Sequence, residues 1–297
     1  MKFDVVLGNP PYQDSNKVSE NRKNTNKPLW YLFVEAIPQL ITERGTVAFV
    51  TPTSWIQPTS LIHKSIASKK LTYVKVYNKS PFNVGTTTSY WIQAPNGADK
   101  VEFATDTDST IIKLQHHEMS LLPVKTTNFL LALSILKKLV TDGASIPAIA
   151  TTFHHSHSKP TIVRRDKDRF FCYPVFHTHQ QTLWTNTPNE LHGLPKVIVS
   201  KTGTFNKTYY DEKSSISQGA VALLVKDSTE GNNLINLLQQ NVYKFINDSL
   251  RAHSTVPTPV LKNLPMVDLS RSWTDEELYK HFNLTLDEIK LIEETIK

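Results

Sequence analysis

The chain has 297 residues and a hydrophobic content of 39%, which is enough for two domains with buried cores. No apolar run approaches about 18 residues and the first residues lack a signal-peptide pattern, so we expect neither a membrane-spanning helix nor secretion. The single cysteine, Cys172, excludes a disulfide framework and a cysteine-rich zinc site and favours a cytoplasmic location, while a net charge of +6 permits a polyanionic partner without requiring one.

The first predicted element is a short buried strand over residues 2–7, followed by the breaker sequence Gly-Asn-Pro-Pro-Tyr at residues 8–12. Proline fixes φ and cannot donate to a strand ladder, so the chain must leave the sheet there in a rigid turn. Ligands of open α/β sheets bind at the carboxyl ends of strands. The Asn9 side-chain oxygen and the Pro10 carbonyl can each accept a hydrogen from an exocyclic amine, and Tyr12 can stack on the ring that carries it. The turn therefore suits the capture of a flat, amine-bearing ring.

The following segments predict a helix and a returning strand. Residues 13–27 are polar and predict a loop over the turn, either a functional lid or a disordered connector. Apolar residues at three- and four-residue spacing predict a helix over residues 28–44, which Pro38 should kink. After a glycine, residues 46–50 predict a strand and residues 51–55 a second turn at a strand's carboxyl end. A strand, a helix and a returning strand form a right-handed parallel unit.

Residues 3–12, Phe-Asp-Val-Val-Leu-Gly-Asn-Pro-Pro-Tyr, resemble the catalytic motif of amino-methyltransferases, especially the gamma-type DNA adenine-N6 methyltransferases of bacterial and phage type II restriction–modification systems. The helix, glycine, strand and second turn that follow resemble the next segment of that family. The resemblance implies that Asn9 and Pro10 hold the amine of a flipped adenine, that Tyr12 stacks on it, and that Pro11 lies near the methyl donor. The alternatives are an ordinary turn and a Pro-Pro-x-Tyr ligand of a peptide-binding domain.

Three further elements are predicted in this part: a helix at residues 60–70, a strand at residues 71–77 and a turn entering a strand at residues 82–92. The resemblance implies that an aromatic side chain from the last of these forms the other face of the base sandwich. Tyr90 and Trp91 are the candidates, with Phe82 behind them. Plain core packing is the alternative for each.

Glycine positions bear on the methyl donor that the resemblance implies, S-adenosylmethionine. Such a donor needs a Gly-rich turn after one strand and an acidic residue after the next. The nine glycines are at 8, 45, 85, 97, 143, 193, 203, 219 and 231, and no two are closer than ten residues, so Gly-x-Gly occurs nowhere. We therefore expect an N-terminally truncated protein that lacks the donor-binding half and is inactive alone.

This absence has a structural consequence for the first strand. In the family's sheet the strand before Asn-Pro-Pro-Tyr lies beside the first donor-binding strand. Without that neighbour, residues 3–7 would form an exposed apolar edge, which soluble proteins avoid. We expect a second polypeptide or a removed N-terminal segment to complete the sheet; alternatively, the N-terminal part rearranges and covers its own edge.

The composition changes after about residue 95, and a boundary is predicted near residue 121. The predicted elements beyond it are a helix at 128–140, short β-type runs at 161–163, 196–200 and 220–225, a helix at 230–252, an extended connector at 253–265, and two helices that open with capping boxes at 274–277 and 285–288. The last part resembles the tail of many bacterial and phage adenine methyltransferases, so the C-terminus is expected to be natural.

Histidines gather in the second half: His154, His155, His157, His177 and His179. Imidazole is a good ligand for zinc, copper or nickel. Because the spacing is irregular and no acidic partner motif is present, we expect surface or phosphate-facing histidines and no metal.

Two basic segments favour contacts with DNA phosphates. The first contains Arg164, Arg165, Lys167 and Arg169, followed by the aromatic residues Phe170, Phe171 and Tyr173. A charged, solvated turn is the alternative there. The second is a strand followed by Lys-x-Gly, which resembles the target-recognition part of type II adenine methyltransferases. The candidate DNA contacts are Arg164, Arg165, Lys201 and Lys207.

The resemblance covers nearly the whole chain. It implies a site-specific, S-adenosylmethionine-dependent DNA adenine-N6 methyltransferase acting on double-stranded DNA. The expected fold is α/β, a partial doubly wound, Rossmann-like methyltransferase sheet at residues 1–120, with a C-terminal α+β target-recognition domain at 121–265 and a helical tail at 266–297. Two alternatives are a non-catalytic DNA-binding remnant or specificity subunit, and a protein glutamine methyltransferase, which shares Asn-Pro-Pro-Tyr. The long recognition-like segment disfavours the latter.

Overall fold

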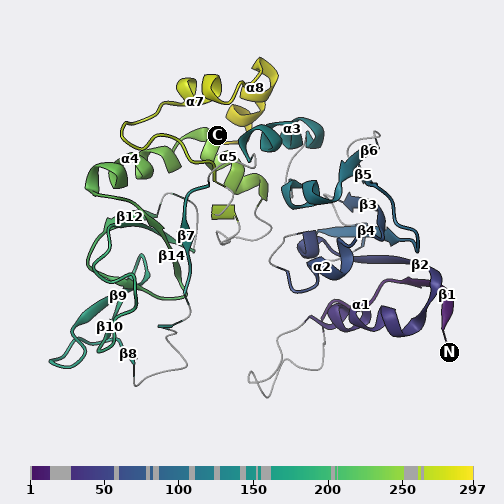
Figure 1. The fold of residues 1–297 in the computed structure, drawn as a ribbon, viewed down its shortest axis with the longest axis horizontal. Helices are drawn as coiled ribbons and strands as arrows, with labels where there is room; N and C mark the ends of the chain where they lie inside the picture. Colours follow the sequence, from purple (N-terminus) through teal and green to yellow (C-terminus); the bar gives the residue numbers. More distant parts are fainter. Residues whose placement is uncertain are drawn as a thin grey trace. The chain divides into compact units, whose positions relative to one another are not determined.

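The computed structural model describes residues 2–13, 28–56, 60–77, 81–82, 87–106, 111–123, 128–140, 145–151, 153–154, 162–201, 205, 207–250, 260–261 and 264–296. The chain divides into two compact units, Met1–Phe129 and Leu130–Lys297, here called the N unit and the C unit (Figure 1). The three-part division predicted from the sequence stays a prediction. No helix among the described residues is long and apolar enough to cross a bilayer.

The N unit is built on a mixed six-stranded sheet in the order β1-β2-β4-β3-β5-β6. Its strands are β1 (Phe3–Gly8), β2 (Ile41–Pro52), β3 (Leu71–Tyr77), β4 (Thr88–Gln93), β5 (Lys100–Thr105) and β6 (Ile112–Gln115). Its helices are α1 (Leu29–Leu40), α2 (His63–Ile66) and the 3₁₀ helices η2 (Thr53–Ile56) and η3 (His116–Leu121). The predicted mixture of helices and strands is confirmed.

β1 and β2 pair in parallel, as the strand–helix–strand pattern predicted. The helix between them is shorter than predicted, because α1 ends at Leu40 and the chain is extended from Ile41. Pro38 lies inside α1 and contributes no N–H, which weakens the last turn. The residues before Thr46 join the sheet instead: Phe3 pairs with Ile41, and the register then shifts in an irregularity. A Cβ on Gly45 would clash with the Ile41 Cγ1 atom and would lie 3.0 Å from the Phe3 carbonyl oxygen, so glycine fits this irregularity.

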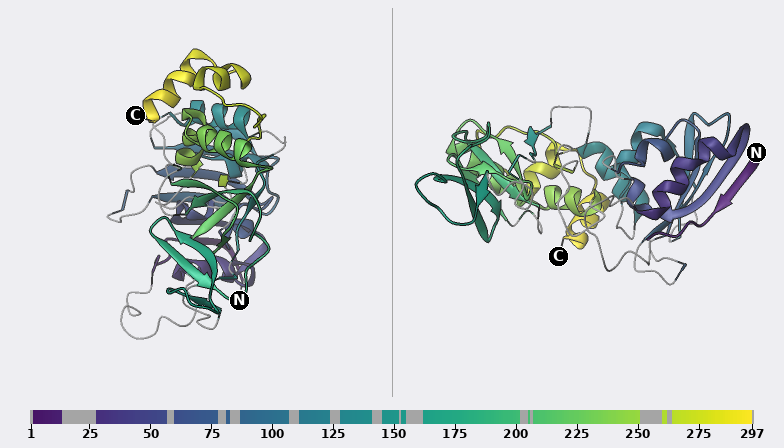
Figure 2. Two further views of the ribbon diagram at one scale, coloured as in Figure 1. Left: turned by 90° about the vertical axis from the view of Figure 1, so that its left-hand side faces the viewer. Right: turned by 90° about the horizontal axis from the view of Figure 1, so that it is seen from below.

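β1 forms an edge of the sheet, and no described strand pairs with its outer side (Figure 1). The right-hand view of Figure 2 shows this strand along the margin of the N unit, next to the N label. Phe3, Val5 and Leu7 are 47%, 57% and 73% exposed. Because alternate residues of a strand point to one face, these three apolar side chains share a face. The prediction that this strand is buried is therefore wrong for the described residues, whereas the exposed apolar edge expected in the absence of a neighbouring strand is present, and no described residue covers it.

The C unit contains two four-stranded sheets, in the orders β13-β9-β10-β8 and β12-β11-β14-β7. Its strands are β7 (Ala148–Ile149), β8 (Val163–Arg164), β9 (Tyr173–Thr178), β10 (Gln181–Thr185), β11 (Lys196–Ser200), β12 (Thr208–Asp211), β13 (Ser215–Ile216) and β14 (Ala220–Leu224). Its helices are α3 (Phe129–Leu139, whose first residue belongs to the N unit), α4 (Ser228–Leu238), α5 (Asn241–Leu250), α7 (Asp275–His281) and α8 (Leu286–Thr295).

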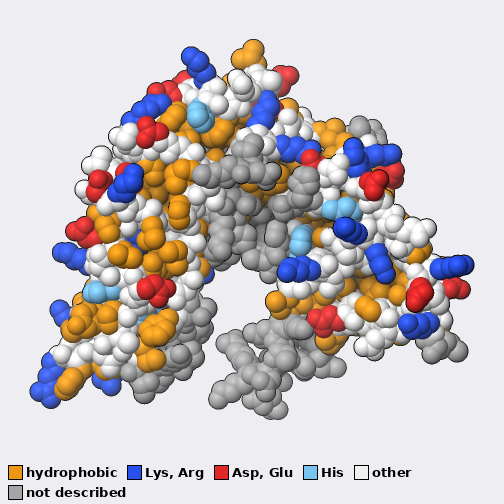
Figure 3. All heavy atoms as spheres, viewed as in Figure 1, with side chains coloured by type: hydrophobic (Ala, Val, Ile, Leu, Met, Phe, Trp, Pro, Cys, Tyr) orange, Lys and Arg blue, Asp and Glu red, His pale blue; other side chains and the backbone are white. Residues whose placement is uncertain are grey.

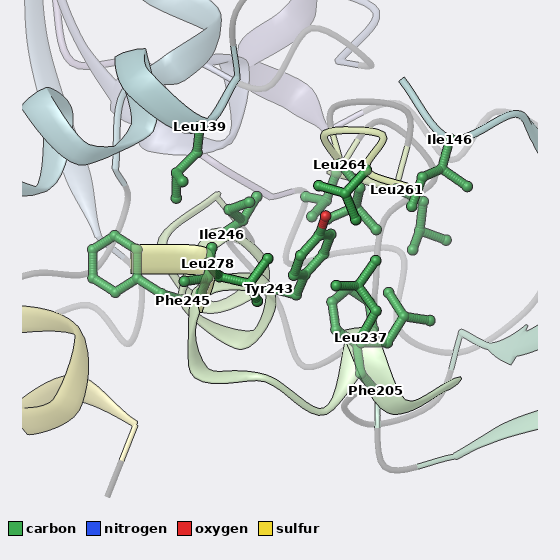
Figure 4. Close-up of a cluster of buried hydrophobic side chains, with 14 of the residues drawn as sticks. Leu139, Ile146, Phe205, Leu237, Tyr243, Phe245, Ile246, Leu261, Leu264 and Leu278 are labelled. Atoms are coloured by element: carbon green, nitrogen blue, oxygen red, sulfur yellow. The ribbon is translucent and has the colours of Figure 1, made fainter. Parts of the chain in front are cut away.

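The helices of the C unit share one apolar core (Figure 4). Tyr243 lies in it, donates a hydrogen bond to the Pro265 carbonyl at 2.8 Å, and has a pKa raised by burial. The two predicted capping boxes are present at the starts of α7 and α8. The prediction of a single helix over residues 230–252 is wrong, because α4 and α5 are separate helices. The Asp275 carboxylate accepts a hydrogen bond from the Asn241 N–H at 2.7 Å and so caps a new helix start there.

Candidate functional site

The Asn-Pro-Pro-Tyr turn directly follows the carboxyl end of β1. Gly8, the last residue of that strand, pairs with Phe49 on β2. The Phe49 ring packs so closely that a Cβ on Gly8 would lie 2.9 Å from its Cε1 atom. In the turn itself Pro10 is buried, whereas the Asn9 side chain is exposed. The turn therefore stands on a packed strand end and presents an amide to solvent.

Tyr12 is the aromatic residue of this turn, and it is half-buried. Its hydroxyl oxygen is buried and has no hydrogen-bond partner among the described residues. Burial raises the pKa of the Tyr12 phenol, so the ring is uncharged at neutral pH. A neutral ring at the end of a rigid turn can stack on a flat ligand.

The second predicted turn follows β2 as the 3₁₀ helix η2, and a buried polar network holds it. The Trp55 indole N–H donates to the Ser89 hydroxyl at 2.8 Å, and Ser89 in turn donates to the Thr51 carbonyl at 3.3 Å. Thr53 and Thr87 share a hydrogen bond between their hydroxyls. Because β1 and β2 are parallel neighbours, their carboxyl ends lie at the same end of the sheet. The Asn9 turn follows one of these ends and η2 follows the other. The sequence indicated this turn but not its attachment to β4.

The two base-stacking candidates lie side by side on β4 but differ in their surroundings. Trp91 is fully buried; its ring centroid is 5.5 Å from that of Phe49, and its N–H donates to the Thr51 hydroxyl at 3.0 Å. These contacts fit the core-packing alternative. Tyr90, which points to the opposite face of the sheet, is half-buried and has its ring centroid 6.0 Å from that of Tyr73.

A groove of about 630 Å³ lies on the N unit and includes none of the predicted site residues. Its lining includes Tyr73, Ile92, Glu102 and Lys113. These residues are in register across β4, β3, β5 and β6, on the face of the sheet to which Tyr90 points. The sequence offered no signal for this groove.

Two of the candidate DNA contacts, Lys201 and Lys207, flank the end of β11 and the start of β12. The Lys207 Nζ atom lies 3.1 Å from the His179 Nε2 atom. The His179 Nδ1 atom is buried without a partner among the described residues. Lys201 is bonded through its backbone N–H to the Gly219 carbonyl at 2.9 Å, and burial lowers the pKa of its side chain. The structure thus places a lysine and a predicted phosphate-facing histidine in direct contact.

The other two candidates, Arg164 and Arg165, are exposed at the end of β8, in the other sheet of the C unit. Arg164 forms an ion pair with Asp168 at 3.3 Å and lies over the Phe171 ring at 4.1 Å. Arg165 has no ion-pair or ring partner within the described parts of the chain. Basic and aromatic side chains that alternate in the sequence here therefore also touch in the structure, as Arg164 and Phe171 do.

The histidines that the structure describes belong to no cluster able to hold a metal ion. His154 is buried, and its Nε2 atom lies 2.8 Å from the Thr187 carbonyl oxygen. His155 and His157 lie outside the described residues. The described residues contain no group of three or more His, Cys, Asp or Glu side chains able to hold a metal ion.

Residues 1–80 match the Eco57I restriction-modification methylase family. This segment contains β1, the Asn9 turn, α1, β2 and η2. The comparison with curated proteins gave no match.

Three solved structures illustrate the likenesses, all distant. The type IIG restriction endonuclease BpuSI is 10% identical, with a TM-score of 0.35 over 95% of this chain and 49% of its own. The type IIL restriction-modification enzyme MmeI, solved in complex with DNA, is 8% identical, with a TM-score of 0.39 over 82% and 43%. A type I restriction-modification methyltransferase subunit from Streptococcus thermophilus is 18% identical, with a TM-score of 0.29 over 38% and 29%. The chain thus spans less than half the length of each.

Proposed function

We propose that this chain carries the acceptor-binding turn and the DNA-recognition part of an S-adenosylmethionine-dependent, gamma-type DNA adenine-N6 methyltransferase of a restriction–modification system. One observation carries the proposal: the turn at Asn9–Tyr12 follows the end of a parallel strand, beside η2, within the 80 residues that match a restriction-modification methylase family. The N-unit sheet is then part of a doubly wound methyltransferase sheet.

The chemistry follows from the groups in the turn. A target adenine rotates out of the duplex, at a cost of about a few kcal/mol. The Asn9 side-chain oxygen and the Pro10 carbonyl accept hydrogen bonds from the adenine amine, which draws its nitrogen toward tetrahedral geometry and directs its lone pair away from the ring. The neutral Tyr12 ring stacks on the base. Tyr90 is a better candidate than Trp91 for a second stacking ring, because Trp91 is buried and already hydrogen-bonded. Positioning, rather than a strong base, supplies the rate acceleration.

The chain's own residues do not make a complete donor site. Gly-x-Gly occurs nowhere in the sequence, and Pro11 is the one residue of the turn that the resemblance places near the donor. The exposed β1 edge supports a partner that supplies this site, either a second polypeptide or a preceding segment, by adding a strand beside Val5 and Leu7.

On the DNA side, we propose that Lys201, Lys207, Arg164 and Arg165 contact phosphates of double-stranded DNA. All four belong to the C unit, and the Lys207 ammonium and the His179 ring already lie together. Phosphate contacts position a protein on a duplex, whereas base contacts specify the sequence. We therefore expect these side chains to set affinity and salt dependence.

The deciding experiment compares Asn9→Ala with wild type in the complete assembly, the chain co-expressed with the product of an adjacent reading frame. We expect Asn9→Ala to abolish adenine methylation while DNA binding stays within about twofold, because only the amine contact is lost. Asn96→Ala, at an exposed turn of the same unit, is the matched control and should change neither. Equal loss of methylation and DNA binding would contradict the role given to Asn9.

A second measurement tests the missing donor site and the main alternative. We expect no saturable binding of S-adenosylmethionine to the isolated chain, and binding once the partner is present. Saturable binding by the chain alone would refute the incomplete donor site. DNA binding without donor binding or methylation in any assembly would favour the non-catalytic remnant or specificity subunit.

A further inference from the structure

The turn that joins β8 to β9 is held rigidly by one carboxylate. Asp168 accepts hydrogen bonds from the backbone N–H groups of Phe170 and Phe171, both at 2.7 Å, through its Oδ1 atom. Its Oδ2 atom accepts one from Arg164 at 3.3 Å, and its own N–H donates to the Phe171 carbonyl at 3.2 Å. The backbone hydrogen bonds from Phe171 and Phe170 lower the pKa of Asp168, so the carboxylate stays ionised at neutral pH.

Cations lie over aromatic rings in and beside this turn. Lys167 lies over the Trp184 ring at 4.9 Å, and Arg169 lies over the Phe170 ring at 4.6 Å. Residues 164–169 contain four basic and two acidic side chains, which leaves a local net charge of +2. Figure 3 shows Lys and Arg side chains together with hydrophobic ones at the end of the C unit where Figure 1 places β8, β9 and β10. The surface here is both basic and aromatic.

Phe170 and its neighbour Phe171 have opposite environments. Phe171 is 5% exposed and packs under Arg164, whereas Phe170 is 63% exposed. Since the Asp168 carboxylate holds the backbone of both residues, Phe170 is presented to solvent by a fixed turn. A large apolar ring held in water forgoes the stabilisation that burial would provide. Such a ring, next to an arginine, is suited to stacking on a flat ligand that carries negative charge.

We propose that the turn at residues 164–171 is a nucleic-acid contact in which Phe170 stacks on a nucleobase and Arg165 and Arg169 bind the flanking phosphates. This inference rests on the proposed function only in taking DNA as the ligand. Stacking needs an unpaired or opened base, so the contact is to single-stranded DNA or to a locally opened duplex. The excess of positive charge matches a polyanion.

The test measures binding of fluorescently labelled duplex and single-stranded oligonucleotides to the full chain across a range of salt concentrations. We expect Phe170→Ala to weaken binding to single strands and to a duplex with one mismatch by roughly 5- to 100-fold, with an unchanged salt slope. Phe170→Trp should keep the affinity. Arg165→Gln should reduce the salt slope by about one phosphate contact. Leu286→Ala, at an exposed apolar residue of the tail, is the control and should change neither.

The outcomes separate this inference from the proposed function. If the wild type binds DNA and Phe170→Ala binds it equally well, the stacking role is overturned and the methyltransferase proposal stands. A chain that binds neither duplex nor single strands in any assembly overturns both. Phe170-dependent binding to vesicles of anionic phospholipid, without DNA binding, would make the turn a membrane contact and refute the inference. Because Phe170, Arg165 and Leu286 are all exposed, all variants should unfold at the wild-type temperature, which thermal unfolding checks.

Discussion

Replacing Gly8 by alanine should destabilise the sheet at the point that carries Asn9. The new Cβ would lie 2.9, 3.3 and 3.4 Å from three atoms of the Phe49 ring, so that ring must move by a few tenths of an ångström. Phe49 is 4% exposed and packs against the fully buried Trp91, which limits its movement. Overpacking of this kind costs about 1–3 kcal/mol. Alanine recovers about 0.4–1 kcal/mol by restricting the unfolded chain, so we expect a net loss of about 1–2 kcal/mol.

Hydrogen exchange of the β1 and β2 backbone amides measures this loss locally, which matters because the chain has two units that need not unfold together. The double variant Gly8→Ala with Phe49→Leu supplies the internal control, since a smaller side chain makes room for the new methyl group. Its destabilisation should be smaller than the sum of the two single effects by about 0.5 kcal/mol or more.

Two results would refute this reasoning about the strand end. Protection of the β1 amides in Gly8→Ala that equals the wild type would show that Phe49 yields freely. Strict additivity in the double variant would show that the cost of Gly8→Ala has another origin.

Three further predictions concern residues of both units. Trp91→Phe removes the indole N–H that donates a hydrogen bond to the Thr51 hydroxyl at 3.0 Å. It should lower the free energy of unfolding in urea by about 1–3 kcal/mol, as expected of a core residue. Burial alone would raise the pKa of Glu288, but its hydrogen bonds, which include one from Lys138 at 2.7 Å, lower that pKa. The stability that the Glu288 carboxylate contributes is therefore present above its ordinary pKa of 4.5 and is lost as the pH falls below that value. Thermal unfolding of Glu288→Gln should show a weaker acid dependence than wild type, and an identical dependence would contradict this. Burial lowers the pKa of Lys201 below 10.5. The phosphate contact that we propose for it should therefore weaken with rising pH earlier than for an ordinary lysine, and Lys201→Arg should abolish that weakening in a DNA-binding titration.

Elements with strong local signals were predictable from the sequence. β3 and β11 begin and end at the predicted residues, 71–77 and 196–200, because both segments are rich in β-branched or aromatic side chains, which favour strands. The capping boxes of α7 and α8 were also predictable, since each box is closed within four residues.

Features that depend on distant partners were not predictable. The break between α4 and α5 depends on Asp275, 34 residues beyond the amide that it caps. Lys196 is fully buried on β11 because Asp211, on the neighbouring strand, pairs with it at 3.0 Å. The extended start of β2 depends on its pairing with Phe3. In each case a tertiary contact outweighs the local preference.

The candidate site shows the same division between local and distant information. The turn at Asn9 was predictable because two prolines and a glycine enforce it locally. The choice between Tyr90 and Trp91 was not, since adjacent strand residues always face opposite sides and only the packed sheet shows which side is covered. Trp91 lies on the covered side, against Phe49.

The direction of β1 constrains any strand that completes the sheet. β1 runs parallel to β2, so the carboxyl ends of both strands lie at the end of the sheet that carries Asn9. A parallel strand added beside β1 would bring its own carboxyl end, the turn after it and the amino end of a following helix to that end of the sheet, where a bound donor could face the amine that we propose Asn9 to hold. An antiparallel strand would bring its amino end there and would leave the turn after its carboxyl end at the opposite end of the sheet. The proposed function therefore requires a parallel partner strand, with apolar side chains on the face that Val5 and Leu7 share.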